Sequence, residues 1–281
     1  MASLIELIFD VPRLEEKLII QELKNLGLEP KLTNVKYEPL SWSDQAADLA
    51  LVRTISMQRA AYSASIREAL GVRTINSSQA ILIAGDKIFT LSALKKAGIP
   101  FPESIVAFNS EAAEKAGELL GYPIVDKPPI GSWGRLVTLV KDPQSLRSII
   151  EHRELYQSQL IKTHLIQKYI SSGNRDLRIL VLGGEVLGGI RRVAAEADWR
   201  SNVARGGKAE PIKIDSELEE LSLKAARVIG GEFIAIDIFE DDGRYLVNEV
   251  NGVPEFKGFM MVTGVNVPRK LAEHVKDLIK K

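Results

Sequence analysis

The sequence has no cysteine, no net charge and no long apolar run. The absence of cysteine excludes disulfides, thiolate metal sites and cysteine nucleophiles. The 37 Lys and Arg residues balance the 37 Asp and Glu residues, so no global field attracts nucleic acid or an anionic membrane. No run approaches the ~20 apolar residues of a membrane-spanning helix, and the acids Glu6 and Asp10 make the N-terminal stretch a poor signal peptide. We therefore expect a cytoplasmic protein that binds neither nucleic acid nor membrane.

Histidine is also scarce. The three histidines, His152, His164 and His274, lie far apart in the sequence, so we expect neither a histidine metal site nor a histidine-based triad. What the chain does have is ordinary globular composition, with 281 residues of which 45% are hydrophobic. That length allows two or three subdomains with cores of their own.

Strand and helix patterns alternate over the first ~85 residues, which favours an open parallel sheet. Residues 4–11 read as a buried strand, and a helical apolar face follows until Gly27. The rest of the chain mixes helices and strands, and strands dominate its last part. We predict an α/β protein, α+β overall, with three segments: 1–87, 88–170 and 171–281.

Acidic and amide side chains gather near the end of the chain. Asp237 lies on one predicted strand, and Glu249 and Asn251 lie on the next. A three-residue hairpin loop at 241–243 would place Asp237 opposite Val247, on the face that carries Glu249 and Asn251. A two-residue loop would turn Asp237 to the other face. Three oxygen ligands on one face suit Mg²⁺; the alternative is a partly buried network with Arg or Lys.

Two lysines are candidates for binding an anion. Lys127 ends a predicted strand just before Gly131 and Gly134, and a loop of this kind can turn amide N–H groups toward phosphate oxygens. Lys87 stands in a similar setting, "AGDKIFT". The alternatives are an ordinary turn at 131–134 and an exposed helix lysine at position 87.

The segment "LIQKYISSGNRDLRI" has backbone groups, from Gln167 to Ile170, that could bind the edge of an adenine. Arginines interleaved with Asn and Gly follow it and suggest an anion site, because arginine binds carboxylate and phosphate in a bidentate manner. The alternative is a solvated basic strand face. These arginines are Arg175, Arg178, Arg191, Arg192, Arg200 and Arg205.

Taken in order, these pieces resemble the RimK-like branch of the ATP-grasp ligases. The pieces are Asp86-Lys87, Lys127-Pro128 with "GSWGR", "QKYI", "RDLRI", "RR", "WRSNVARGG", Asp237 and "NEVN". Within that branch, "NEVNGVPEFKGF" is similar to the LysX and ArgX carrier-protein ligases. Its Gly258-Phe259 pair resembles the glutamate-type, ArgX version.

The resemblance implies an ATP-grasp fold with an N-terminal α/β domain, a central lid and a C-terminal half, and with ATP between the last two. It implies ATP and two Mg²⁺ ions as cofactors, with Asp237, Glu249 and Asn251 as metal ligands and Glu249 as the bridge. The implied partners are LysW, an acidic carrier protein, and glutamate. The implied reaction joins the γ-carboxylate of LysW's C-terminal glutamate to the amino group of the free glutamate through an acyl phosphate, in arginine biosynthesis. Ligation of α-aminoadipate in lysine biosynthesis and a RimK-type addition of glutamate to a protein tail are the alternatives. The oligomeric state, including a homo-oligomer, is left open.

The resemblance also implies residue roles. Arg192, Lys127 and Asn202 would be catalytic, with Arg192 and Asn202 at the γ-phosphate and substrate end. The nucleotide would contact Lys87, Lys127, Gly131, Ser132, Trp133, Gly134, Arg135, Gln167, Lys168, Tyr169, Ile170, Asp176, Arg178 and Asn202. The amino acid would contact Arg192, Val203, Ala204, Phe256, Lys257, Gly258, Phe259 and Met260. Many relatives have Glu where Lys168 stands, and Asn248 is expected to point away from the metal side.

Overall fold

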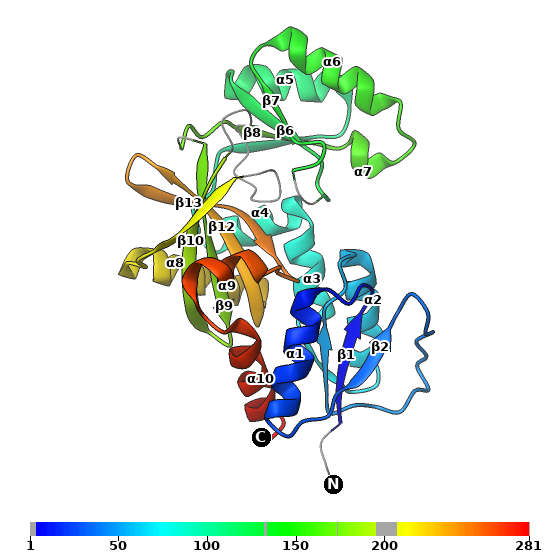
Figure 1. Ribbon diagram of the computed structural model, residues 1–281. Helices are drawn as coiled ribbons and strands as arrows, with labels where there is room; N and C mark the ends of the chain where they lie inside the picture. Colours follow the sequence, from blue (N-terminus) through cyan, green and yellow to red (C-terminus); the bar gives the residue numbers. More distant parts are fainter. Residues whose placement is uncertain (1–3, 132–133, 173, 195–206, 281) are drawn as a thin grey trace.

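The structure is a computed structural model that describes residues 4–131, 134–172, 174–194 and 207–280 (Figure 1). The described residues form three β-sheets, which follow one another along the chain. In the view of Figure 1 the central sheet lies at the top, the C-terminal sheet at the left and the N-terminal sheet at the lower right, and α3 (Ser78–Gly85) and α4 (Lys87–Lys96) lie between them. Among the helices that the structure describes, none is long and apolar enough to cross a membrane.

The N-terminal sheet is parallel throughout, with the strand order β2-β1-β3-β4. Every residue of β1 and β3 is buried, which is typical of a parallel sheet that is covered on both faces. The predicted parallel sheet is therefore confirmed. Its elements are β1 (Ile5–Phe9), α1 (Leu14–Asn25), β2 (Lys31–Asn34), β3 (Leu49–Val52), α2 (Met57–Glu68), β4 (Arg73–Ile75) and α3 (Ser78–Gly85).

The central sheet is antiparallel, with the order β5-β8-β6-β7. Helices α5 and α6 pack on it through a core that includes Ala113, Leu146 and Ile150. The elements are α4 (Lys87–Lys96), β5 (Ser104–Ala107), α5 (Ser110–Leu120), β6 (Ile124–Lys127), β7 (Thr138–Val140), α6 (Pro143–Glu154), α7 (Gln159–Lys162) and β8 (His164–Lys168).

The C-terminal sheet is antiparallel and has the order β11-β10-β9-β12-β13. The amphipathic helix α8 buries Leu218, Ala225 and Ile229 against it. The elements are β9 (Arg175–Leu182), β10 (Glu185–Val193), β11 (Lys208–Ile212), α8 (Ser216–Ile229), β12 (Phe233–Asp241), β13 (Arg244–Asn251), α9 (Lys257–Thr263) and α10 (Val267–Leu278).

Two helices connect the segments. Leu91 and Leu94 of α4 join the core of the C-terminal sheet, although the predicted division assigns α4 to the central segment. At the other end of the chain, α10 packs against α1 of the N-terminal segment (Figure 1). The N-terminal and C-terminal segments therefore share apolar contacts, and the sheet of the central segment lies at the top of the view (Figure 1).

A buried charge cluster fixes the central sheet. Arg153 of α6 donates from Nη1 to Asp126 Oδ2 at 2.6 Å, and His164 Nδ1 lies 3.1 Å from Asp126 Oδ1. The Arg153 and Asp126 side chains are only 4% and 0% exposed. Arg153 also donates to the carbonyls of Ile161 and Thr163, so this one side chain connects α6, β6 and the start of β8.

We expect Asp126→Ala to lower the free energy of unfolding by about 3–5 kcal/mol, because it leaves a buried guanidinium without its carboxylate. Urea denaturation measures this change. Glu114→Ala is the control, since Glu114 and Arg147 form an exposed pair on α5 and α6 that contributes only about 0–1 kcal/mol. Equal losses in the two variants would contradict the structural role of Asp126.

Candidate active site

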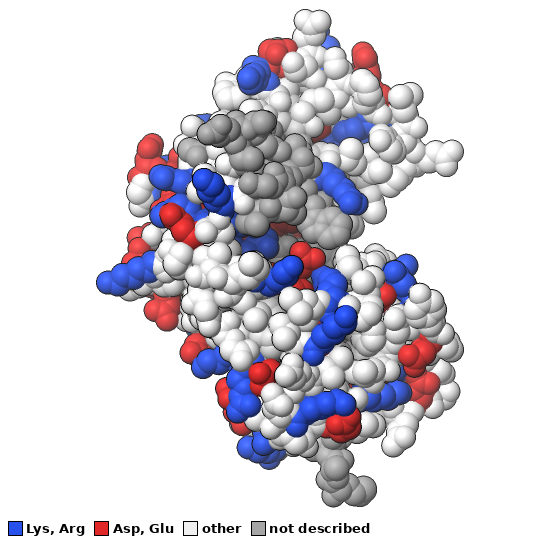
Figure 2. All heavy atoms as spheres, in the orientation of Figure 1, with Lys and Arg blue, Asp and Glu red and all other residues white. Residues whose placement is uncertain are grey.

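One large cleft among the described residues brings most of the predicted site residues together. Its volume is about 1290 Å³ and residues from all three segments line it. In the space-filling view the surface narrows between the upper lobe and the lower part of the molecule, and Lys and Arg side chains lie on both sides of this indentation (Figure 2). The predicted residues that line the cleft are Lys87, Lys127, Gly131, Gly134, Arg135, Gln167, Lys168, Tyr169, Ile170, Asp176, Arg178, Arg192, Asp237, Glu249, Asn251, Lys257, Gly258 and Phe259. Ser132, Trp133, Asn202, Val203 and Ala204 lie outside the described residues.

The hairpin of β12 and β13 sets the positions of the acidic residues, but not with the predicted register. Asp241 pairs with Arg244, so the loop has two residues, Asp242 and Gly243, both with positive φ, as short hairpin loops favour. The predicted three-residue loop is therefore wrong. A β-bulge then shifts the register of the two strands by one residue. Ile238 pairs with Val247, whereas the preceding residue, Asp237, pairs with Glu249.

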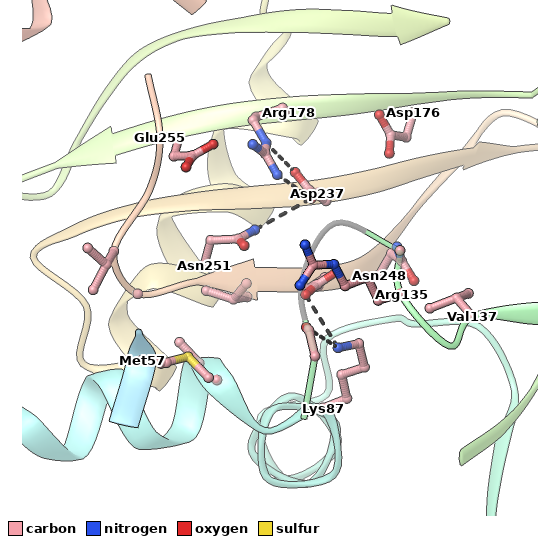
Figure 3. Close-up of a pocket in the computed structure, with 18 of the residues that line it drawn as sticks. Met57, Lys87, Arg135, Val137, Asp176, Arg178, Asp237, Asn248, Asn251 and Glu255 are labelled. Carbon is pink, nitrogen blue, oxygen red and sulfur yellow. Dashed lines mark hydrogen bonds and ion pairs between the residues drawn. The ribbon is translucent and has the colours of Figure 1, made fainter. Parts of the chain in front are cut away.

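The bulge therefore places the two carboxylates directly opposite each other on neighbouring strands. The predicted proximity of Asp237, Glu249 and Asn251 is present, and the amide nitrogen of Asn251 lies 3.5 Å from Asp237 Oδ2 (Figure 3). A bulge sets two residues of one strand against one residue of its partner. The period-two alternation of side chains along a strand therefore does not by itself predict that Asp237 faces Glu249.

Asn248 is the extra residue of the bulge, and its side chain is part of the site. Its Oδ1 accepts a hydrogen bond from Lys127 Nζ at 3.0 Å, and the residue lines the cleft. The prediction that Asn248 points away from the site is therefore wrong, because it assumed an unbroken period of two along β13. Asn248 connects the C-terminal hairpin to the end of β6.

The two candidate lysines lie side by side at the base of the cleft. Lys87 is the first residue of α4, and its Nζ donates to the Gly131 carbonyl at 3.1 Å and lies 3.5 Å from Glu249 Oε1. Both lysines are buried. Burial and the Lys87 ammonium lower the pKa of Lys127 to about 8, and Glu249 partly opposes that effect. Lys87 is therefore not the exposed helix lysine of the alternative interpretation.

The arginines pair with the acids on the C-terminal sheet. Arg178 holds Asp237 with two hydrogen bonds of 2.7 Å, and Arg192 Nη2 lies 3.1 Å from Asp237 Oδ2. Arg192 in turn holds Asp176 with bonds of 2.7 and 2.6 Å. Burial raises the pKa of Asp237, but the two guanidinium groups outweigh it and lower the pKa to about 2. Arg192, with 5% of its side chain exposed, and Arg178, with 20% exposed, thus pair with acids and do not form a solvated basic face. For Asp237 this is the partly buried network that the sequence offered as the alternative to a metal site.

The acidic set fits a hard divalent cation. Among the described residues no cluster of three or more His, Cys, Asp and Glu side chains occurs, and the donors here are two carboxylates and one amide. Oxygen donors of this kind, few in number, suit Mg²⁺, which keeps waters and binds substrate phosphates as well. A carboxylate has about four lone-pair sites, and turning the Asn251 amide would direct its oxygen toward Asp237. Asp237, Glu249 and Asn251 could therefore hold such an ion.

The predicted adenine segment lies at the end of β8. The amides of Lys168 and Tyr169 donate to the carbonyls of Glu103 and Pro123, at 2.8 and 3.3 Å. The Ile170 carbonyl also accepts a hydrogen bond, from the amide of Ser172 at 3.0 Å, so an adenine edge would use other backbone groups of this segment, such as the Ile170 amide. The Gln167 side chain is buried and donates to Ser104 Oγ, whereas the Lys168 side chain points to solvent.

The predicted amino-acid segment only partly faces the cleft. Lys257, Gly258 and Phe259 line it. Phe256 is fully buried in the core and its side chain does not line the cleft, nor does that of Met260. The Phe259 ring lies over β10, where a Cβ at position 188 would come within 3.2 Å of Phe259 Cζ. Gly188 therefore makes room for this ring.

The sequence reasoning missed the contribution of the N-terminal segment. Asp10, Arg13 and Glu15 line the cleft. Ligand sites of parallel sheets lie at the carboxyl ends of the strands, and Asp10 directly follows β1, just as Arg53 and Asn76 follow β3 and β4. That rule could have identified this edge from the sequence.

Two family models match the chain. A model of the RimK-like ATP-grasp domain matches residues 84–275, and a model of the LysX preATP-grasp domain matches residues 5–83. A solved structure of a RimK domain ATP-grasp protein from Sphaerobacter thermophilus is similar, with a TM-score of 0.81 and 25% identity over 97% of this chain and 99% of that one.

Curated relatives are more similar in sequence. The chain is 46% identical to a glutamate–LysW ligase ArgX of Sulfolobus acidocaldarius, over 97% of this chain and 98% of the relative. It is 41% identical to an α-aminoadipate–LysW ligase LysX of Sulfurisphaera tokodaii, over 98% of both chains.

The lowered pKa of Lys127 predicts that the cleft would bind a polyphosphate such as ATP with a pH-dependent affinity. Above about pH 8 the ammonium of the free protein loses its proton, whereas phosphate oxygens beside it would raise its pKa again. We expect binding at about pH 9 to take up a proton, and the affinity to fall up to about 10-fold per pH unit above the free pKa. Calorimetry in buffers of different ionisation enthalpy measures the uptake.

Lys127→Arg is the matched control, because a guanidinium stays protonated over this pH range. Proton uptake should disappear in that variant. The same uptake in both proteins would mean that another group titrates on binding.

Proposed function

The chain belongs to the RimK-like ATP-grasp ligases, and we propose that it joins glutamate to an amino-group carrier protein of the LysW type. The observation that carries the proposal is the 46% identity, across nearly the full length of both chains, to a relative named glutamate–LysW ligase. In the proposed reaction, the γ-carboxyl of the carrier's C-terminal glutamate forms an amide with the α-amino group of free glutamate. The product would serve arginine biosynthesis.

Glutamate is favoured over α-aminoadipate by two observations. Identity to the ArgX relative exceeds identity to the LysX relative, 46% against 41%. In addition, Phe259 is held against β10 at the wall of the cleft, where its ring would limit the length of a bound amino acid. One methylene group changes binding by only about 1–3 kcal/mol. Slow ligation of α-aminoadipate is therefore expected beside ligation of glutamate.

The nucleotide is proposed to lie between the central and C-terminal sheets. Lys87 and Lys127 would contact its phosphates, since two ammonium groups near one carboxylate, Glu249, leave local positive charge. The 131–137 segment would cover the phosphates, and the backbone at 167–170 would hold the adenine. Asp237, Glu249 and Asn251 would hold two Mg²⁺ ions, which would neutralise charge on the transferring phosphoryl group.

In the proposed chemistry a carboxylate oxygen of the carrier attacks the γ-phosphorus of ATP, and ADP leaves. The amino group of glutamate then attacks the acyl carbon, loses a proton to solvent, and phosphate leaves. Positioned charge supplies most of the catalysis in phosphoryl transfer, so no nucleophilic side chain is needed. Arg192, held between Asp176 and Asp237, would present its guanidinium at the acceptor end of the cleft.

Intact-mass measurement of a LysW-type carrier tests this function. After incubation with the protein, ATP, Mg²⁺ and glutamate, we expect the carrier to gain the mass of one glutamate residue. α-Aminoadipate should be added more slowly. A shift with α-aminoadipate alone would favour the LysX reaction, and an unchanged carrier with either amino acid would reject both.

Glu249→Gln and Glu240→Gln form a matched pair for the metal assignment. Both glutamates belong to the β12–β13 hairpin, and both side chains are 29% exposed, but only Glu249 faces the cleft lysines. Ligation should fall by at least about 100-fold in Glu249→Gln, because the Mg²⁺ that Glu249 would hold no longer neutralises the charge of the transition state. It should stay near the wild-type rate in Glu240→Gln. Equal activity in the two variants would contradict the assignment.

A further inference from the structure

Residues 252–257, which lead from the end of β13 into the first residue of α9, are held mainly by the N-terminal segment. Asn76 Nδ2 donates to the Gly252 carbonyl at 2.7 Å, and Arg53 Nη1 donates to the Pro254 carbonyl at 2.9 Å. Both donors directly follow strands of the parallel sheet, so its carboxyl edge faces this segment. We call residues 252–257 the acceptor loop.

Glu15 makes the closest contacts with the acceptor loop. Its Oε1 accepts hydrogen bonds from the amides of Phe256 at 2.5 Å and Lys257 at 2.7 Å. These amides belong to the N-cap and first residue of α9, and the Phe256 side chain makes no capping hydrogen bond of its own. The first N–H groups of a helix have no partner within the helix. A carboxylate of α1 therefore supplies the cap of a helix that is 241 residues away in sequence.

Arg53 contacts the same loop from the buried side, through the Pro254 carbonyl and the Phe256 ring. Its side chain is 1% exposed and its guanidinium lies 5.8 and 5.2 Å from the ring centres of Phe233 and Phe256. It also lies 3.5 Å from Glu15 Oε2 and from Glu16 Oε1. Burial lowers the pKa of Arg53, and the two carboxylates partly offset this. Its Nε and Nη2 have no partner in hydrogen-bonding geometry within the described chain.

A buried charge that lacks hydrogen-bond partners costs desolvation energy. Replacing a buried ion pair with apolar side chains of similar volume often leaves a protein equally stable, so stability alone does not account for Arg53. What the Glu15–Arg53 pair does provide is a fixed position for the backbone of Pro254, Phe256 and Lys257. The residues that follow, Gly258 and Phe259, line the cleft. A shift of the acceptor loop would therefore move the proposed amino-acid pocket.

The nucleotide side of the cleft does not depend on these contacts. Asp237 and Glu249 are fixed by the β12–β13 ladder, and Lys87 and Lys127 by α4 and β6. Displacing the acceptor loop would leave those four side chains in place. The two substrates should therefore respond differently to a change at position 15.

We propose that Glu15 and Arg53 are positioning residues, through which the N-terminal segment fixes the acceptor loop and so sets the affinity for the amino acid. The inference rests on the proposed ligase function for its kinetic consequence. Its structural part, the hold on the acceptor loop, stands independently of that function.

Steady-state kinetics of Glu15→Ala tests the proposal. We expect KM for glutamate to rise about 10- to 100-fold, because misplacing a bound group by about 1 Å has effects of that size, while KM for ATP stays within about twofold. Glu15→Gln should restore much of the affinity, since its amide oxygen can accept from the same two N–H groups.

Glu6→Ala is the matched control. Glu6 is also a buried carboxylate of the N-terminal segment, 2% exposed, and it pairs with Arg67, which is 1% exposed like Arg53. It contacts the parallel sheet and not the acceptor loop. This variant should lower Tm without changing the ratio of the two KM values. If the ratio of KM for glutamate to KM for ATP were the same in Glu15→Ala and Glu6→Ala, Glu15 would only stabilise the fold, and the proposal would be overturned.

Hydrogen–deuterium exchange supplies a readout that does not need activity. The amides of Phe256 and Lys257 should exchange faster in Glu15→Ala than in the wild type, and not in Glu6→Ala. Unchanged exchange at both amides would also overturn the proposal. A wild-type protein that ligates no amino acid would reject the proposed function, and the exchange result would then decide alone whether Glu15 holds the loop.

Discussion

The β-bulge at Asn248 is the constraint on which the rest of the site depends. Because β13 contains one residue more than its partner at that point, Asp237 faces Glu249 and the Asn248 side chain reaches Lys127. Without the bulge, the two-residue hairpin would set Asp237 opposite Asn248, and the carboxylates would no longer face each other. One additional residue thus aligns the acidic pair and also links the hairpin to the central sheet.

Charge in the cleft is organised by pairing and not by net charge. On the C-terminal sheet, Arg178 and Arg192 are matched by Asp237 and Asp176. At the base, two lysines lie near the single carboxylate of Glu249. Burial, together with this local excess of positive charge, lowers the pKa of Lys127. A chain with a formal net charge of zero can therefore still present a site for a polyphosphate, because the field that matters is local.

Some features could be predicted from the sequence because local patterns determine them. The buried runs at β1 and β3 indicate a parallel sheet. Most of the cleft residues were predicted in a different way, from the resemblance of the ordered motifs to the ATP-grasp ligases. The bulge could not be predicted, because register depends on cross-strand contacts that no single strand encodes. Asn248 was misassigned for that reason. Glu15 and Arg53 were missed because they contact a segment some 200 residues later in the chain.

The most direct test of the site is a crystal structure with a non-hydrolysable ATP analogue and Mn²⁺ in place of Mg²⁺. The geometry of the hairpin predicts anomalous peaks at about 2.0–2.2 Å from oxygens of Asp237 and Glu249, next to the phosphates and within reach of Asn251. Peaks bound only by phosphates or by other acids, with Asp237 still held by both arginines, would contradict the proposal that the bulge builds the metal site.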